Sequence, residues 1–269
     1  MSMRKVIPII ILVSVSFGLT MGDLYSQPAQ VNELLQQPKL IEDIKRTLAS
    51  NGQDIINIES NLKSLQEELE ALNATREKLI EDKAEGLDSV TKQKSVVEER
   101  ITTLDETMRV RTDIEDMANN LAEELDIMST MTERKNKISD EAALMPASQF
   151  EGIQNELELF KARLEATTSS VKEKGTYLSA SQASLGASRV KLEEERKKLK
   201  DKIRKLTSQK PSTREESYQI ETMKHSLESE IKLKDEKVNL LLTQTKLARL
   251  NLQTAQIQEV NIQSQIETN

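Results

Sequence analysis

The chain of 269 residues contains no cysteine and no tryptophan, and it has 2% aromatic and 31% charged residues. Aromatic side chains usually supply much of the bulk of a compact core, so this composition argues against an ordinary globular domain and is typical of long helices. The net charge of -7 disfavours nucleic acid as a partner. The absence of cysteine excludes disulfides and thiolate metal sites.

Residues 1–22 have the features of a secretory signal. Arg4 and Lys5 precede an apolar run over residues 6–19, and this run is shorter than the roughly 20 apolar residues that a membrane-spanning helix needs. We predict a signal peptide over residues 1–22 and an exported protein, periplasmic or secreted. The alternative is an uncleaved signal-anchor that holds the protein to the membrane through residues 6–19, and membrane contact is expected only in that case.

Residues 23–52 are expected to form a lead-in that contains a short amphipathic helix. Pro38 suits the first turn of this helix, and Asn51-Gly52 is a helix stop signal. The next helix is therefore expected to begin after this stop.

A long coiled-coil helix is predicted over residues 53–145. Its apolar residues alternate in steps of three and four, as the buried seam of a coiled coil requires. The clearest seam positions are Leu62, Leu65, Leu69 and Leu72. The pattern weakens around Gly86, so this helix either projects past its neighbours or bends back on itself there.

The most regular pattern in the chain lies on a second long helix, predicted over residues 147–210. Apolar residues occupy one heptad position eight times in succession: Leu157, Leu164, Val171, Leu178, Leu185, Leu192, Leu199 and Leu206. Such a stripe is typical of the seam of a long helix packed on another helix. Residues 166–188 are rich in Ser, Thr, Ala and Gly, which indicates either a thin, locally unstable stretch or a hinge or docking site.

A third long helix is predicted over residues 212–269. Each helix junction combines a proline with the capping-box pattern S-x-x-E: Pro146 with Ser148 and Glu151, and Pro211 with Ser212 and Glu215. Short turns place consecutive helices antiparallel. The predicted fold is all-α, an elongated antiparallel coiled-coil rod of three long helices preceded by a short helix. The tail after Arg249 carries few charges and is a candidate self-association face.

No catalytic, cofactor-binding or metal-ligating constellation stands out in the sequence. It has no glycine-rich phosphate loop and no H-E-x-x-H motif, and His225, the only histidine, is expected to face solvent. We therefore predict no cofactor, no metal and no enzymatic activity.

Residues 189–210 carry ten basic and four acidic residues. This run is either a solvated helix face or a patch that binds an anionic partner, such as phosphate-rich lipid or an acidic polymer. The residues of the predicted patch are Arg196, Lys197, Lys198, Lys200, Arg204 and Lys205. No aromatic residues interleave them, which disfavours single-stranded nucleic acid as the partner.

The heptads and the export signal are similar in general terms to exported coiled-coil modules of bacterial envelope proteins, such as hydrolase activators and the periplasmic helical regions of mechanosensitive channels. The catalytic-type domain of the first and the membrane pore of the second are missing from this sequence. The leading hypothesis is a structural or scaffolding protein of the cell envelope that spaces or tethers protein partners, including copies of itself, through helical surfaces. The alternatives are a periplasmic holdase-type chaperone and an accessory coiled-coil partner of an envelope channel or hydrolase.

Overall fold

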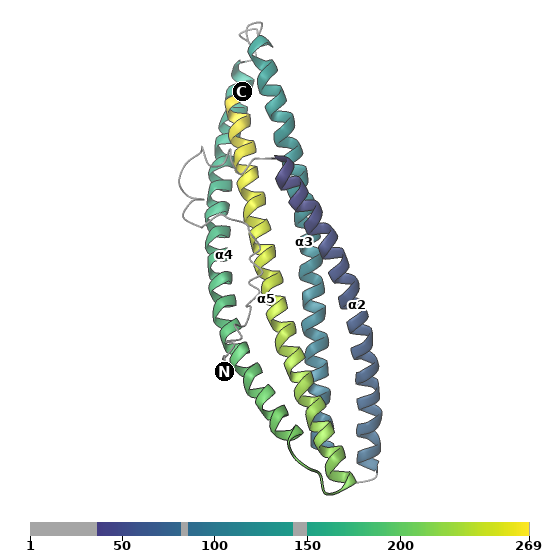
Figure 1. Ribbon diagram of the computed structural model, residues 1–269. Helices are drawn as coiled ribbons and strands as arrows, with labels where there is room; N and C mark the ends of the chain where they lie inside the picture. The colour runs from purple at the N-terminus through teal and green to yellow at the C-terminus, as the bar shows by residue number, and fades with distance from the viewer. Residues whose placement is uncertain (1–36, 82–85, 142–149, 269) are drawn as a thin grey trace, which may run out of the picture. The chain divides into compact units, whose positions relative to one another are not determined.

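The computed structural model describes residues 37–81, 86–141 and 150–268, and these residues form four helices and no strands. The helices are α2 (Gln37–Glu81), α3 (Leu87–Glu141), α4 (Phe150–Thr207) and α5 (Arg214–Thr268) (Figure 1). The prediction of an all-α fold is confirmed for the described residues. The predicted signal segment and the helix junction at Pro146 lie outside them.

The chain divides into two compact units, residues 1–43 and 44–269. Of the first unit, the described residues 37–43 form the first turns of α2. All contacts discussed below lie within the second unit.

Helix α2 shows that the predicted helix stop at Asn51-Gly52 is wrong. The helix runs through both residues without a break, so the expected short helix is the first part of a 45-residue helix. The buried Asn51 side chain donates a hydrogen bond of 2.8 Å from Nδ2 to the backbone carbonyl of Arg111 on α3. This tertiary contact compensates for the cost of about 1 kcal/mol that a glycine imposes on a helix interior.

The single helix predicted over residues 53–145 is also wrong, because the chain forms two helices there. Helix α2 ends at Glu81 and α3 begins at Leu87. Gly86 has a φ of 107°, in the left-handed region that glycine enters without steric cost. Its carbonyl accepts a hydrogen bond of 3.2 Å from the Val90 amide in the first turn of α3. Of the two alternatives at Gly86, the structure has the one in which the chain bends back.

Helices α2 and α3 form an antiparallel hairpin with an apolar core (Figure 1). The buried residues of this core are Ile58, Leu62 and Leu65 of α2 and Val97 and Leu104 of α3. Leu69 and Leu72 are partly buried and pack against the same cluster. The four seam positions predicted on this helix therefore lie at the interface with α3.

Helices α4 and α5 form a second antiparallel hairpin. Their contacts run in opposite directions along the two helices, as shown by the pairs Thr168 with Glu259, Ser181 with Thr245 and Arg196 with Asp235. In the eight-heptad stripe, Leu178 and Leu199 are buried and the other six residues are half-buried. Because α4 packs along α5, the helix that covers this stripe is α5 of the same chain. Residues 166–188 remain helical throughout.

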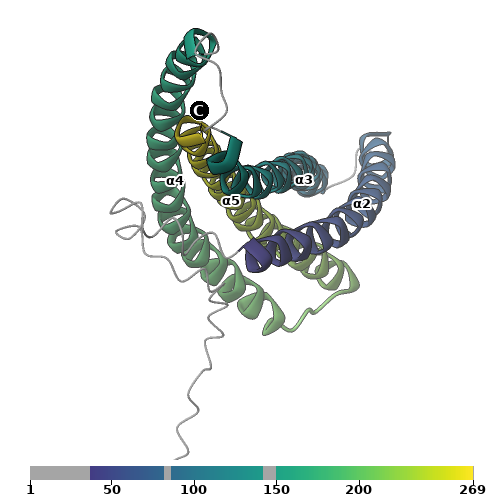
Figure 2. The ribbon, with the colours of Figure 1, turned by 90° about the horizontal axis from the view of Figure 1, so that it is seen from above.

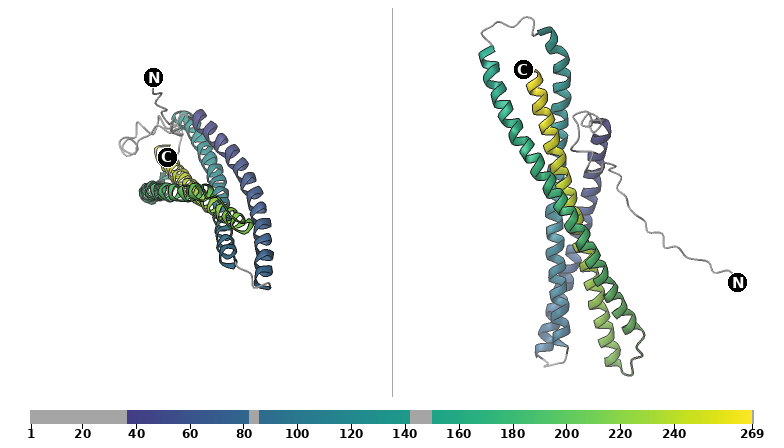
Figure 3. Two further views of the ribbon diagram at one scale, coloured as in Figure 1. Left: turned by 60° about the horizontal axis from the view of Figure 1, so that its bottom comes forward. Right: turned by 90° about the vertical axis from the view of Figure 1, so that its left-hand side faces the viewer.

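The two hairpins join through α3 and α5, which run parallel to each other (Figures 2 and 3). Residue numbers rise together along this interface: Arg100 with Glu236, Glu106 with Gln244, and Glu124 with Asn261. The antiparallel arrangement predicted for consecutive helices holds within each hairpin, whereas the direct packing of α3 on α5 was not identified from the sequence. Helix α5 is thus packed on both α3 and α4.

The capping box at the start of α5 lies one residue later in the chain than the predicted pair of Ser212 and Glu215. Thr213 Oγ1 accepts a hydrogen bond of 3.1 Å from the Glu216 amide, and the Glu216 carboxylate accepts one of 2.7 Å from the Ser212 amide. The cap therefore consists of Thr213 and Glu216, because the helix begins at Arg214 and a capping box joins the N-cap to the third helical residue.

The tail of α5 is not the free face that the sequence suggested. Leu250, Leu252, Ala255 and Ile257 are buried within the chain. Asn261 Nδ2 donates a hydrogen bond of 2.9 Å to the backbone carbonyl of Glu124 on α3. This face is already covered, so self-association through it is not expected.

Candidate functional site

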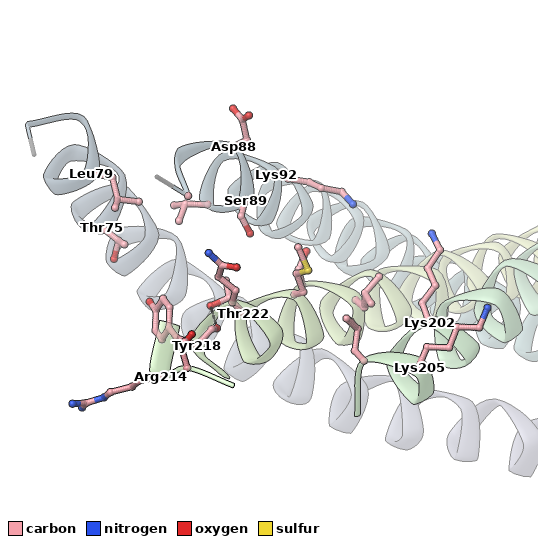
Figure 4. Close-up of a pocket in the computed structure, with 18 residues that line it drawn as sticks. Thr75, Leu79, Asp88, Ser89, Lys92, Lys202, Lys205, Arg214, Tyr218 and Thr222 are labelled. Carbon is pink, nitrogen blue, oxygen red and sulfur yellow. Dashed lines mark hydrogen bonds between the residues drawn. The ribbon is translucent and has the colours of Figure 1, made fainter. Parts of the chain in front are cut away.

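The tips of the two hairpins diverge (Figure 3), and a cleft of about 1450 Å³ lies between them (Figure 4). Its walls come from the end of α2, the start of α3, the end of α4 and the start of α5. We call it the hairpin-tip cleft, and its lining residues are Thr75, Leu79, Gly86, Asp88, Ser89, Val90, Lys92, Lys202, Lys205, Leu206, Thr213, Arg214, Tyr218, Gln219, Thr222, Met223, Ser226 and Leu227.

The cleft exists because α5 extends past the start of α3. Contacting residues of α3 and α5 are about 137 positions apart, as in the pairs Met117 with Thr254 and Glu124 with Asn261. At this offset Leu87, the first residue of α3, lies level with position 224 of α5. Residues 214–223 of α5 therefore lie beyond the start of α3, over a length of about 15 Å at the usual helical rise. The face of α5 that α3 covers farther along is not covered by α3 here.

Apolar side chains from all four helices line the cleft: Leu79, Val90, Leu206, Met223 and Leu227. Val90 is buried, whereas Met223 is 52% exposed. Tyr218 is 70% exposed and stands on the first turns of α5, with Thr75 and Leu79 of α2 on the other side of the cleft (Figure 4). A cleft that combines apolar side chains with a few polar groups is the usual form of a binding site.

The charged groups at the rim of the cleft are mostly cationic. Lys92, Lys202, Lys205 and Arg214 line it together with the single acid Asp88. Lys92 Nζ is paired with Glu230 at 2.7 Å. Within the described part of the chain, no ion pair involves Lys202, Lys205 or Arg214. Figure 4 shows the Arg214 and Asp88 side chains pointing outward.

The part of the α3/α5 interface next to the cleft is polar. We define this polar segment as residues 92–111 of α3 and 229–246 of α5. The buried guanidinium of Arg100 forms a forked pair with the Glu236 carboxylate, with a shortest distance of 2.7 Å between Nη2 and Oε1. Arg100 Nη1 also donates a hydrogen bond of 3.4 Å to Ser229 Oγ. Because a forked pair requires a defined orientation of both groups, these contacts favour one register of α3 on α5.

A second polar cluster closes the far end of the polar segment, where α2, α3 and α5 meet. Arg111 Nη1 lies 2.6 Å from Asp54 Oδ2 and donates a hydrogen bond of 3.3 Å to Asn51 Oδ1. Burial lowers the pKa of Lys246 on α5, and the neighbouring Arg111 lowers it further, while Asp54 acts in the opposite direction. None of these residues lines the cleft, so their role is in helix packing.

The structure divides the predicted basic patch. Arg196 is engaged in packing, since it pairs with Glu193 on its own helix and with Asp235 on α5. Lys205 lines the hairpin-tip cleft. The other four residues, Lys197, Lys198, Lys200 and Arg204, are exposed on α4 outside the cleft.

Several residues of the cleft were not identified from the sequence. Lys202 belongs to the basic run and could have been included in the patch. Lys92, Arg214, Tyr218 and Met223 come from separate places in the chain, and no periodic pattern marks them. They meet only because the two hairpins pack through α3 and α5.

In the part of the chain that the structure describes, no group of three or more His, Asp or Glu side chains is placed to hold a metal ion. No described helix combines the length and the apolar character needed to cross a bilayer. His225 is exposed, with Nδ1 at 3.7 Å from a carboxylate oxygen of Glu228. No protein-family model, curated protein or solved structure matches the chain.

Proposed function

We propose that this protein is an exported scaffolding protein of the cell envelope that tethers protein partners, and that the hairpin-tip cleft is one of its binding surfaces. The observation that carries this proposal is the cleft itself, which four helices line where two well-packed hairpins diverge. The heptad seams favour a coiled-coil rod as the shape of the scaffold. The basic and apolar pattern of residues 1–22 favours export.

The dimensions of the cleft suit a polypeptide segment better than a small molecule. Pockets for small molecules usually measure about 300–1,000 Å³, whereas this cleft has about 1450 Å³. Its mixture of apolar side chains, an exposed tyrosine and charged groups resembles the composition of a protein–protein interface. These features favour binding of a protein over catalysis on a small substrate.

A photo-crosslinking experiment in the native source tests the binding surface. A benzoylphenylalanine replaces Tyr218 in the cleft or, as the matched control, Tyr177, which is 63% exposed on α4 and lies outside the cleft. We expect protein adducts from position 218 that are absent from position 177. Identical adducts from both positions, or none from position 218, would contradict a binding role for the cleft.

The export and rod components of the proposal have separate tests. We expect a mature chain that begins near Asp23 in the envelope fraction, whereas full-length protein in the cytosol would contradict export. Retention of Met1 in the membrane fraction would select the signal-anchor alternative. Small-angle scattering should give a radius of gyration well above the roughly 18 Å of a compact chain of this length.

A holdase-type chaperone is the second candidate function. The observation that favours it is the exposed apolar surface of Met223 and Tyr218 beside the cations Lys202 and Lys205, since unfolded clients bind to such surfaces. Light scattering of a chemically denatured client protein distinguishes the two functions. A holdase suppresses aggregation of many unrelated clients at equimolar concentration, and a dedicated scaffold does not.

A further inference from the structure

We propose that the occupant of the hairpin-tip cleft is an acidic amphipathic helix of a protein partner, which lies along the start of α5 in line with α3. This inference rests on the proposed function, because it names the class of partner that the scaffold would bind. Three properties of the cleft support it: the register of the helices, the direction of the lining stripe and the charge.

The register leaves one face at the start of α5 uncovered by α3. Farther along the molecule, α3 packs on α5 in parallel. Near the tips, residues 214–223 of α5 extend past the first residue of α3 by about three helical turns. A partner helix that lies along residues 214–223 would cover the face of α5 that α3 covers farther along.

The residues of α5 that line the cleft extend along one face of the helix. Arg214, Tyr218, Thr222 and Ser226 line the cleft at intervals of four residues, and Gln219, Met223 and Leu227 form a second row beside them. Residues four apart lie on the same face of a helix, so the cleft is a groove parallel to α5. Grooves of this type bind amphipathic helices through apolar side chains at positions i, i+3 or i+4, and i+7.

The charge of the groove determines which polar face its partner should have. The Lys202 and Lys205 side chains from α4 and Arg214 from α5 lie at the rim, and none of them has an ion-pair partner among the described residues. Lys92 is already neutralised by Glu230. A helix with glutamates on the side that faces α4 would pair with the remaining cations, and a helix with lysines there would be repelled.

A binding assay with defined peptides tests this proposal on the full chain. The probe is a fluorescein-labelled 14-residue helix (about four turns) with leucines along one face and glutamates elsewhere. Its control has lysines in place of the glutamates. We expect the acidic peptide to bind, with an affinity that falls as salt is added, and the basic peptide to bind at least about tenfold more weakly.

Two charge-reversal variants on one helix locate the site. Lys202→Glu with Lys205→Glu changes two residues of the cleft, and Lys197→Glu with Lys198→Glu makes the same change in net charge on exposed residues of α4 outside it. We expect the first pair of substitutions to lower the affinity for the acidic peptide by about tenfold or more. The second pair should lower it by less than about twofold. Circular dichroism of both variants verifies that the helices are intact.

A third variant tests the apolar contribution. Met223→Asp places a charge on the floor of the groove and should abolish binding of the acidic peptide, whereas Val190→Asp, at a residue of α4 that is 64% exposed outside the cleft, should not. Equal effects of the two charge-reversal pairs, or equal binding of the acidic and basic peptides, would overturn the proposal.

Vesicles of phosphatidylglycerol serve as the alternative anionic partner. Vesicle binding that Lys202→Glu with Lys205→Glu abolishes, in the absence of peptide binding, would replace the protein partner with a membrane surface. Protein adducts from position 218 without binding of the acidic peptide would leave the scaffold function intact and reject only the acidic helix. If both experiments are negative, the proposed function is rejected as well.

Discussion

The α3/α5 interface has two halves that differ in their share of buried charged and apolar side chains. The polar segment next to the cleft is held by ion pairs, including Arg100 with Glu236. The other half, which we call the apolar segment, comprises residues 114–128 of α3 and 248–261 of α5. Its core residues on α3 are Ile114, Ala118, Leu121, Leu125 and Met128, each exposed by 4% or less.

The two segments contribute differently to the structure. Apolar burial stabilises in proportion to the area removed from water and is not directional, so the apolar segment holds the hairpins together. Ion pairs that are partly buried contribute less net free energy because desolvation opposes them, but they require a defined geometry. The polar segment therefore selects the register of α3 on α5, and that register determines how far α5 extends into the cleft.

The largest expected effect is the loss of a side chain from the apolar segment. Leu121→Ala should reduce the free energy of unfolding by about 2–5 kcal/mol, because Leu121 is 1% exposed and its removal leaves a cavity. Ile127→Ala on the same helix is the control, since Ile127 is 40% exposed and should lose less than about 1 kcal/mol. Equal losses in urea unfolding would show that the interface is not held by its apolar half.

The second effect concerns the polar segment. Arg100→Met should lower the free energy of unfolding by about 2 kcal/mol, because it leaves the half-buried Glu236 carboxylate without its partner. The double variant with Glu236→Leu should recover much of this loss. Lys237→Met, which breaks the more exposed pair with Glu99, should cost less than about 1 kcal/mol. A double variant as unstable as Arg100→Met would mean that the ion pair itself stabilises the fold.

A smaller effect is expected at the border between the two segments. The pKa of Lys246 is lowered in the folded state, so the folded protein binds this proton less strongly than the unfolded chain does. Stability should therefore rise as the pH increases from the folded-state pKa toward the ordinary value of 10.5. Lys246→Met should remove this dependence and stabilise the protein at neutral pH by less than about 1 kcal/mol. The exposed Lys232 provides the control position on α5.

The smallest effect lies outside both segments, at the exposed cap of α5. Hydrogen bonds from the Ser212 hydroxyl and amide lower the pKa of Glu216 below 4.5. This contribution to stability is present above that pH and is lost as the pH falls through the folded-state pKa. Glu216→Gln should flatten the pH dependence of amide hydrogen exchange in the first turn of α5 and leave global unfolding unchanged. Glu221→Gln on the same helix serves as the control.

The long-range periodicity of the sequence was sufficient to predict an all-helical chain and its seam positions, but not the bounds of α2 and α3. Seven leucines and Val171 at one heptad position, from Leu157 to Leu206, predict a helix with one covered face, and α5 packs along this helix. Asn51-Gly52 shows where a local signal fails. The pair has the pattern of a helix stop, but α2 runs through it, and the Asn51 side chain bonds to α3, a contact that depends on the fold.

The cleft could not be predicted because it depends on the parallel pairing of α3 with α5. Arg100, Thr103 and Thr107 are buried, yet in the sequence they resemble surface residues. The pairing depends on contacts between residues about 137 positions apart, which heptad analysis of single helices does not detect. The basic run of α4 was visible, but its division into Arg196 in packing and Lys205 in the cleft was not.

The same spacing of contacts has a consequence for the order of folding. Within the α4/α5 hairpin, paired residues are 39 to 91 positions apart, from Arg196 with Asp235 to Thr168 with Glu259, and Asn51 and Arg111 of the α2/α3 hairpin are 60 apart. Helices α3 and α5 pair across 129 to 138 positions. Doubling a loop adds about 0.6 kcal/mol to its closure cost, and local contacts generally form faster. We expect the two hairpins to close first and α3 to dock on α5 last. Substitutions in the apolar segment should then accelerate unfolding, while those in the hairpin cores should slow folding.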